Sequence, residues 1–147
     1  MKPLCKRFFG ALLAICMLSS IFCTVASAMD ARYSDYLDSY VCSVTPKGNG
    51  KIIVSATVSA IVNATQIGAT DVYIYESSNN EDFTCVEHYN YEDYPNMMGS
   101  GRGFNRDVAT YYGTPGKYYY AAVYVYAGDS TGGDTRSYDT ASVRAYR

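Results

Sequence analysis

Hydrophobic and polar residues alternate with a period of two along much of the chain. The clearest case is the segment 51–62, in which Ile52, Val54 and Val58 fall on one side while serine and threonine residues fall on the other. A period of two is that of a β-strand with one buried face. The alternation predicts strands at about 40–45, 51–62, 70–77, 83–91, 107–112, 117–127 and 136–146.

Turn-forming residues separate the predicted strands. Glycine, proline, asparagine and aspartate cluster between them, and such clusters favour turns because these residues accept the backbone angles that turns require. The predicted turns are 46–50, 78–82, 113–116 and 128–134, and the aperiodic stretch 92–106 is predicted to be a loop. About seven short strands without helical periodicity after residue 28 predict an all-β fold, a single antiparallel β-sandwich of the immunoglobulin or fibronectin type III kind.

Tyr119 follows the predicted turn 113–116 at the start of a strand. Sandwiches of this kind often place a tyrosine at such a corner, with its hydroxyl bonded back to the backbone. A strand rich in tyrosine could also have one there by chance, so both interpretations stand.

The first 28 residues have the composition of a secretory signal peptide. Lys2, Lys6 and Arg7 precede an apolar run over 8–25, and the small residues 26–28 resemble a cleavage site. We therefore expect a signal peptide over 1–28, one immunoglobulin-like domain over 29–147, and a secreted, extracellular protein. The apolar run is a weaker candidate for a membrane span, so we expect no membrane association after the signal is removed.

Removal of the signal changes the charge and the cysteine count. The remaining chain has 9 Lys and Arg against 14 Asp and Glu, a net charge of −5, and its arginines are interspersed with acids. Nucleic acid is therefore not an expected partner, because binding it requires a basic surface. Only Cys42 and Cys85 remain, and two cysteines in an exported chain could form a disulfide. In the predicted sandwich Cys42 and Cys85 lie on edge strands at opposite ends of the two sheets, too far apart for a disulfide, so we expect two separate thiols.

No pattern of chemistry-bearing residues identifies an enzyme. His88 is the only histidine, so neither a Ser-His-Asp triad nor a zinc site has its usual motif. We expect His88 on the surface of an acidic strand, no catalytic residue, no metal and no cofactor. Asp129 and Asp134 flank a glycine-rich turn but lack the spacing of a calcium loop. A hydrolase is the remaining enzymatic alternative, and its candidate carboxylates are Glu81, Asp82, Glu87, Glu92 and Asp93.

Tyrosine is the unusual residue of the chain, with 17 copies and no tryptophan. If Val72, Ile74, Val123 and Val125 point inward, the tyrosines of opposite parity point outward and share one solvent face of the sheet. These tyrosines are Tyr73, Tyr75, Tyr118, Tyr120, Tyr124 and Tyr126. Two more outward tyrosines, Tyr138 and Tyr146, are expected from the last predicted strand. The candidate ligand-binding residues are Tyr73, Tyr75, Tyr120, Tyr124, Tyr126, Tyr138 and Arg144.

Three interpretations of these tyrosines remain open. They could stack against a glycan, the cell wall or an extracellular protein, because tyrosine offers contact area at low entropy cost. They could instead only stabilise the sheet through cross-strand pairs, or fill the core if the parity is inverted. We expect a non-catalytic extracellular binding module, with a structural or self-associating extracellular protein as the alternative.

Three segments together resemble a family of small secreted bacterial proteins with an immunoglobulin-like domain of unknown function. They are YVCSVTPKGNGK at 40–51, IGAT at 67–70 and GKYYYAAVYVYAG at 116–128. The resemblance implies an immunoglobulin-like sandwich and bacterial export, and it supplies no catalytic residues. The chain departs from the family pattern at Phe83, where the family would have tryptophan.

Overall fold

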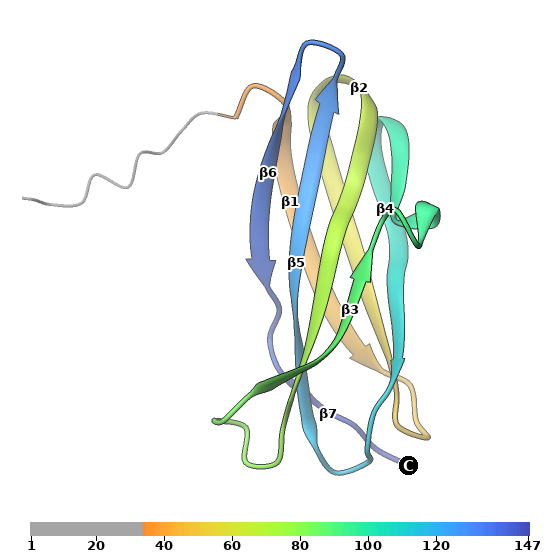
Figure 1. The fold of residues 1–147 in the computed structure, drawn as a ribbon, viewed down its shortest axis with the longest axis vertical. Coiled ribbons are helices and arrows are strands. Elements are labelled where there is room, and N and C mark those ends of the chain that lie inside the picture. The colour runs from red at the N-terminus through yellow and green to blue at the C-terminus, as the bar shows by residue number, and fades with distance from the viewer. Residues whose placement is uncertain (1–33) are drawn as a thin grey trace, which may run out of the picture. The chain divides into compact units, whose positions relative to one another are not determined.

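The computed structural model describes residues 34–147, so the signal peptide expected over 1–28 lies outside the described residues. The described part is all-β, with 71% of it in seven antiparallel strands of one curled sheet (Figure 1). The strands are β1 Leu37–Pro46, β2 Lys51–Ser77, β3 Thr84–Asn90, β4 Met98–Tyr112, β5 Tyr118–Asp129, β6 Gly132–Asp139 and β7 Val143–Arg144. One short 3-10 helix, η1 over Pro95–Met97, precedes β4.

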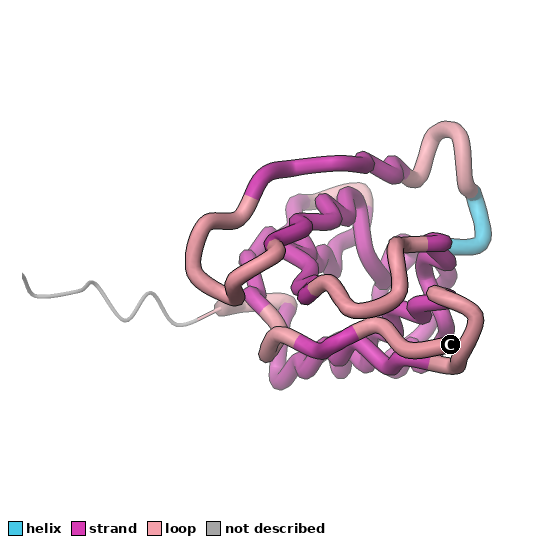
Figure 2. The backbone as a smooth tube through the Cα atoms, turned by 90° about the horizontal axis from the view of Figure 1, so that it is seen from below, coloured by secondary structure: helices cyan, strands magenta, loops and turns pink. Residues whose placement is uncertain are grey.

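The strand β2 organises the sheet. It has 27 residues and folds back near the top of Figure 1, where β4 follows the same bend. The first half of β2 pairs with β1 and β4, and its second half pairs with β5 and β3. Figure 2, which views the strands end-on, shows β3 as an outlying strand that leads toward η1.

The buried side of the sheet is the side that the alternation predicts. Ile52, Val54 and Val58 on the first half of β2 are at most 1% exposed, as are Val72 and Ile74 on its second half. The inward residues of β5 complete the core, and all of them are fully buried: Tyr119, Ala121, Val123, Val125 and Ala127. Burial of these apolar side chains is the main force that stabilises the curled sheet.

The prediction of separate strands at 51–62 and 70–77 is wrong, because the backbone remains paired between them. Ala64 and Ile67 pair with Gly101 and Gly99 of β4 across the bend. The loop predicted over 92–106 is confirmed over 92–97, which lies outside the strands, and is wrong from Met98 onward, where β4 begins. Glycine has no side chain, so the glycines of β4 interrupt the alternation of apolar and polar residues. The alternation therefore does not indicate a strand in this part of the sequence.

The last predicted strand, 136–146, is divided into β6 and β7. Thr140 interrupts it: its side chain is buried and its hydroxyl accepts the backbone N–H of Ala121 at 3.0 Å. Across this break the inward parity changes, from even residue numbers in β6 to Val143 and Ala145. The predicted turn 128–134 shrinks to residues 130–131, because Gly132 and Gly133 continue the ladder with β5.

Tyr119 points into the core as expected and joins the loop 113–117 to β2. Its hydroxyl accepts the backbone N–H of Thr114 at 2.8 Å and donates to the carboxylate of Glu76, which also contacts Lys117 Nζ. Burial is the main reason that the pKa of Tyr119 is raised to about 12. The phenol therefore remains a hydrogen-bond donor throughout the neutral pH range.

The expectation of two separate thiols is confirmed for the described residues. Cys42 lies on β1 and is buried in the core, whereas Cys85 lies on β3 and is exposed. Burial raises the pKa of Cys42 to about 12. Since the thiolate is the nucleophile, the protonated Cys42 thiol is unreactive in the folded state.

In the native protein comprising residues 29–147, which contains two of the five cysteines, we expect iodoacetamide to alkylate Cys85 and not Cys42. Cys42 is shielded and protonated, so it should react only after unfolding in urea. Mass spectrometry of tryptic peptides before and after denaturation measures this directly. Equal labelling of both thiols under native conditions would contradict the buried position of Cys42.

Candidate binding face

Six tyrosines lie on the outward side of β2 and β5, and we refer to them as the tyrosine face. They alternate with the fully buried residues of the same strands, and Tyr124 is 39% exposed while the others are half-buried. The tyrosine face consists of Tyr73 and Tyr75 from β2 and Tyr118, Tyr120, Tyr124 and Tyr126 from β5. The interpretation in which these tyrosines fill the core is therefore wrong.

Ring contacts hold the middle of the tyrosine face in place. Tyr75 stacks on Tyr120 with ring centres 4.8 Å apart, and Phe83 meets Tyr120 edge-on at 4.8 Å. Tyr73 meets Tyr124 edge-on at 6.0 Å. Offset and edge-to-face pairs of this kind each stabilise a fold by about 0.5–1.5 kcal/mol beyond area burial. The rings therefore stabilise the sheet and are held in fixed orientations by one another.

His88 is exposed on β3, which confirms the expected surface position. Its contact with the tyrosine face was not predicted from the sequence. His88 lies opposite Tyr73 on β3, stacks on that ring at 4.2 Å, and its Nε2 is 2.9 Å from Asp71 Oδ1. The side chains of His88 and Asp71 are both more than a third exposed, so the contact between them contributes little to stability. Desolvation of the partly covered rings raises the pKa of Tyr73 and Tyr120, so both hydroxyls stay protonated at neutral pH.

Tyr138 does not lie on the tyrosine face, and its expected outward position is wrong. It pairs directly with Val123 and packs against the core, where its ring meets Tyr40 edge-on at 6.2 Å. The parity change at Thr140 explains the error, because the prediction extended the inward parity of Val143 and Ala145 back through an unbroken strand.

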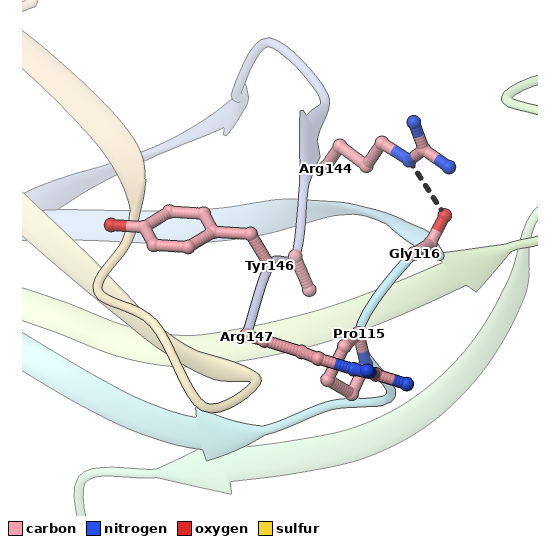
Figure 3. A pocket seen from close by; sticks show the side chains of 6 residues that line it. Pro115, Gly116, Arg144, Tyr146 and Arg147 are labelled. Atoms are coloured by element: carbon pink, nitrogen blue, oxygen red, sulfur yellow. Dashed lines mark hydrogen bonds between the residues drawn. The ribbon is translucent and has the colours of Figure 1, made fainter.

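Arg144 extends the tyrosine face at its Tyr118 end. It pairs with Tyr118, its guanidinium carbon is 5.7 Å from that ring centre, and its Nε donates to the Gly116 carbonyl at 2.9 Å. Figure 3 shows Arg144 pointing toward Gly116 while Tyr146 points the opposite way. The Tyr146 hydroxyl donates to the Pro46 carbonyl at the end of β1 at 3.3 Å, so Tyr146 lies outside the tyrosine face. The hollow drawn there has a volume of about 340 Å³ and is lined by Pro115, Gly116, Arg144, Ala145, Tyr146 and Arg147.

A second hollow, of about 320 Å³, adjoins the other end of the tyrosine face. Its lining residues are Gln66, Thr70, Tyr91, Met98, Tyr126 and Thr135. Only Tyr126 was a candidate from the sequence. The lining comes from several strands and from the segment after β3, and no local pattern in the sequence shows that these segments meet.

The carboxylates of the hydrolase alternative lie on exposed segments. Asp82 accepts from the Asn79 side chain at 2.8 Å before β3, and Asp93 accepts from the Asn90 side chain at 2.7 Å after it. These two acids are therefore separated by the length of β3, roughly 20 Å for a strand of its length. Glycosidase carboxyl pairs are about 5–9.5 Å apart, so Asp82 and Asp93 do not form such a pair.

Within residues 34–147, no three histidine, cysteine or acidic side chains gather in a way that could hold a metal ion. No helix in this part of the chain is long and apolar enough to cross a bilayer. No protein-family model, no curated protein and no solved structure matches the chain.

Proposed function

We propose that the chain is a secreted, non-catalytic binding module that contacts an extracellular glycan, cell wall or protein through the tyrosine face. The observation that carries this proposal is the row of partly exposed phenol rings fixed on paired strands. Tyr124 presents its ring to solvent beside Tyr73, and Tyr75 and Tyr120 form a second stacked pair. Rigid phenols with free hydroxyls favour contact with sugar rings or polar protein surfaces, because little side-chain entropy is lost on binding.

We infer an immunoglobulin or fibronectin type III sandwich as the finer description of the fold. The pairing supports it: β1, the first half of β2 and β4 form one ladder, and β3, the second half of β2, β5 and β6 form the other. The bond from the Thr114 N–H to the Tyr119 hydroxyl resembles a tyrosine corner. The signal-like segment 1–28 and the family resemblance support export from a bacterium.

Self-association is the second candidate function. Within the described residues β3 pairs only with β2, so one of its edges is open, and Val86 on it is 38% exposed. An open edge with an apolar side chain can pair with another copy of the chain. Self-association would make the apparent size rise with concentration without any ligand, whereas a binding module would remain monomeric.

We expect residues 29–147 to be retained by at least one insoluble polysaccharide or peptidoglycan preparation. The double variant Tyr73→Ala/Tyr124→Ala should lose about tenfold in retention, because it removes the most exposed ring of the tyrosine face and its neighbour. Tyr112→Ala is the matched control, since Tyr112 is 69% exposed at the end of β4 and outside the tyrosine face. Pull-down of the three proteins, with circular dichroism as a check of folding, measures the effect.

The outcomes separate the two candidate functions. Retention that is equal in all three proteins would assign binding to another surface. No retention, together with sedimentation that depends on concentration, would favour the self-associating protein.

A further inference from the structure

The hollow beside Tyr126 lies where residues of four paired strands meet in one row of the sheet. Gly68 of β2 pairs with Tyr126 on one side and with Met98 on the other, and Tyr126 pairs in turn with Thr135. Gly68 contributes no side chain to this row, and Gln66 and Thr70 flank it two residues away on either side. The opening beside this row has a volume of about 320 Å³, near the lower end of the range for small-ligand pockets.

Tyr126 is a fixed wall of this hollow. Its ring packs against the β5–β6 hairpin so closely that a Cβ on Gly128 or Gly133 would lie 2.2 Å from its hydroxyl oxygen. Any residue with a side chain at either glycine would clash with the Tyr126 ring in this position. A ring held in this way loses little freedom when a ligand stacks on it.

The opposite side of the hollow is tied to the same strands by hydrogen bonds. The backbone N–H of Tyr91 donates to the Thr70 carbonyl at 3.0 Å, and the Thr70 hydroxyl donates to the Tyr124 carbonyl at 3.3 Å. The second bond connects the hollow directly to the tyrosine face. Tyr91 is 36% exposed, so its ring is accessible to a ligand.

The lining chemistry selects the class of ligand. Two phenol rings and a thioether offer apolar contact, and one amide and two hydroxyls offer both donors and acceptors, while none of the six side chains is charged. A charged ligand would find no opposite charge here, and a wholly apolar one would desolvate the amide and hydroxyls without replacing their hydrogen bonds. A sugar ring has apolar C–H faces and hydroxyl edges, which match both parts of the lining.

We propose that this hollow binds one uncharged sugar ring of a neutral glycan whose neighbouring units lie along the tyrosine face. Tyr91 and Tyr126 contact the faces of the ring, and the Gln66 amide and the Thr135 hydroxyl bond to its hydroxyl groups. This assignment rests on the proposed binding function and names its ligand class.

The test is a titration of ¹⁵N-labelled protein, residues 29–147, with cellohexaose, maltohexaose, chitohexaose and hexagalacturonate. We expect at least one of the three neutral hexaoses to shift the Gln66 side-chain amide and the backbone amides of Tyr91 and Thr135 saturably. Tyr91→Ala should weaken that affinity about tenfold and Gln66→Ala about fivefold. The control Tyr112→Ala should bind as the parent does, and the charged hexagalacturonate should bind at least tenfold more weakly.

Three results would overturn the assignment. Saturable shifts confined to the Tyr73, Tyr75 and Tyr120 region, with full affinity in Tyr91→Ala, would place the ligand on the tyrosine face alone and leave the proposed function intact. Preference for hexagalacturonate would contradict a neutral ligand. No saturable shift with any neutral hexaose would remove the sugar-binding hollow, and retention on insoluble material, lost in Tyr73→Ala/Tyr124→Ala, would still decide the proposed function separately.

Discussion

Replacement of Tyr119 by alanine is expected to lower the free energy of unfolding by about 3–5 kcal/mol. The ring is fully buried, and the loop beside it is packed so tightly that a Cβ on Gly113 would lie 2.5 Å from Tyr119 Cζ. Removal of the ring leaves a cavity between this loop and β2 that the backbone can fill only in part. Urea denaturation followed by circular dichroism measures the loss.

The variant Tyr119→Phe separates the packing of the ring from its hydrogen bonds. It keeps the ring but leaves the Thr114 N–H without its acceptor and Glu76 without one donor, which should cost about 1–3 kcal/mol. Tyr112→Phe is the matched control, because Tyr112 is exposed and should change stability by less than about 0.5 kcal/mol. Equal stability of Tyr119→Phe and the parent would show that the buried hydroxyl contributes nothing.

The dependence of the unfolding free energy on pH in the acid range gives an independent measure of the contact between Tyr119 and Glu76. Hydrogen bonds from Lys117, and then from Tyr119, lower the pKa of Glu76 from its ordinary value of 4.5. The unfolded chain takes up this proton at a higher pH than the folded one, so the stabilisation is complete above about pH 4.5 and is lost as the pH falls further. Tyr119→Phe should therefore flatten the loss of stability below pH 4.5.

The alternation of residues was sufficient to predict which side of each regular strand is buried. Val72 and Ile74 are in the core and the tyrosines beside them are outward, because a strand of period two leaves only one choice once the apolar side is known. The alternation of inward and outward side chains continues within one strand, but it is not maintained across an interruption of the strand. Thr140 is such an interruption, and the error at Tyr138 follows from it.

The bend of β2 and the early start of β4 could not be predicted in this way. Residues 98–103 contain three glycines, which carry no polarity pattern, and their pairing with Ala64 and Ile67 is a contact between distant segments. The hollow beside Tyr126 depends on the same pairing. The tyrosine face was thus largely predictable from the alternation within single strands. Prediction of the hollow, including Tyr91 and Gln66, would have required the pairing register of four strands.

Gly68→Ala is expected to destabilise the fold by about 3–5 kcal/mol. It should also displace η1 from the bend of β2. Gly68 has φ +148°, a backbone angle that residues with a side chain rarely adopt. A Cβ there would lie 2.2 Å from the Met97 carbonyl oxygen and 3.1 Å from the Phe104 ring, which is itself in the core. Either β2 or the start of β4 must move, and both movements break ladder pairs.

Gly103→Ala is the control that separates this clash from the general effect of adding a methyl group to a strand. Gly103 lies in β4, pairs with Ser59 of β2, and has open space where its Cβ would be. An alanine there should be neutral or stabilise by up to about 1 kcal/mol, because it restricts the unfolded chain. Urea midpoints of both variants give the comparison, and equal midpoints would mean that the bend tolerates a side chain at Gly68.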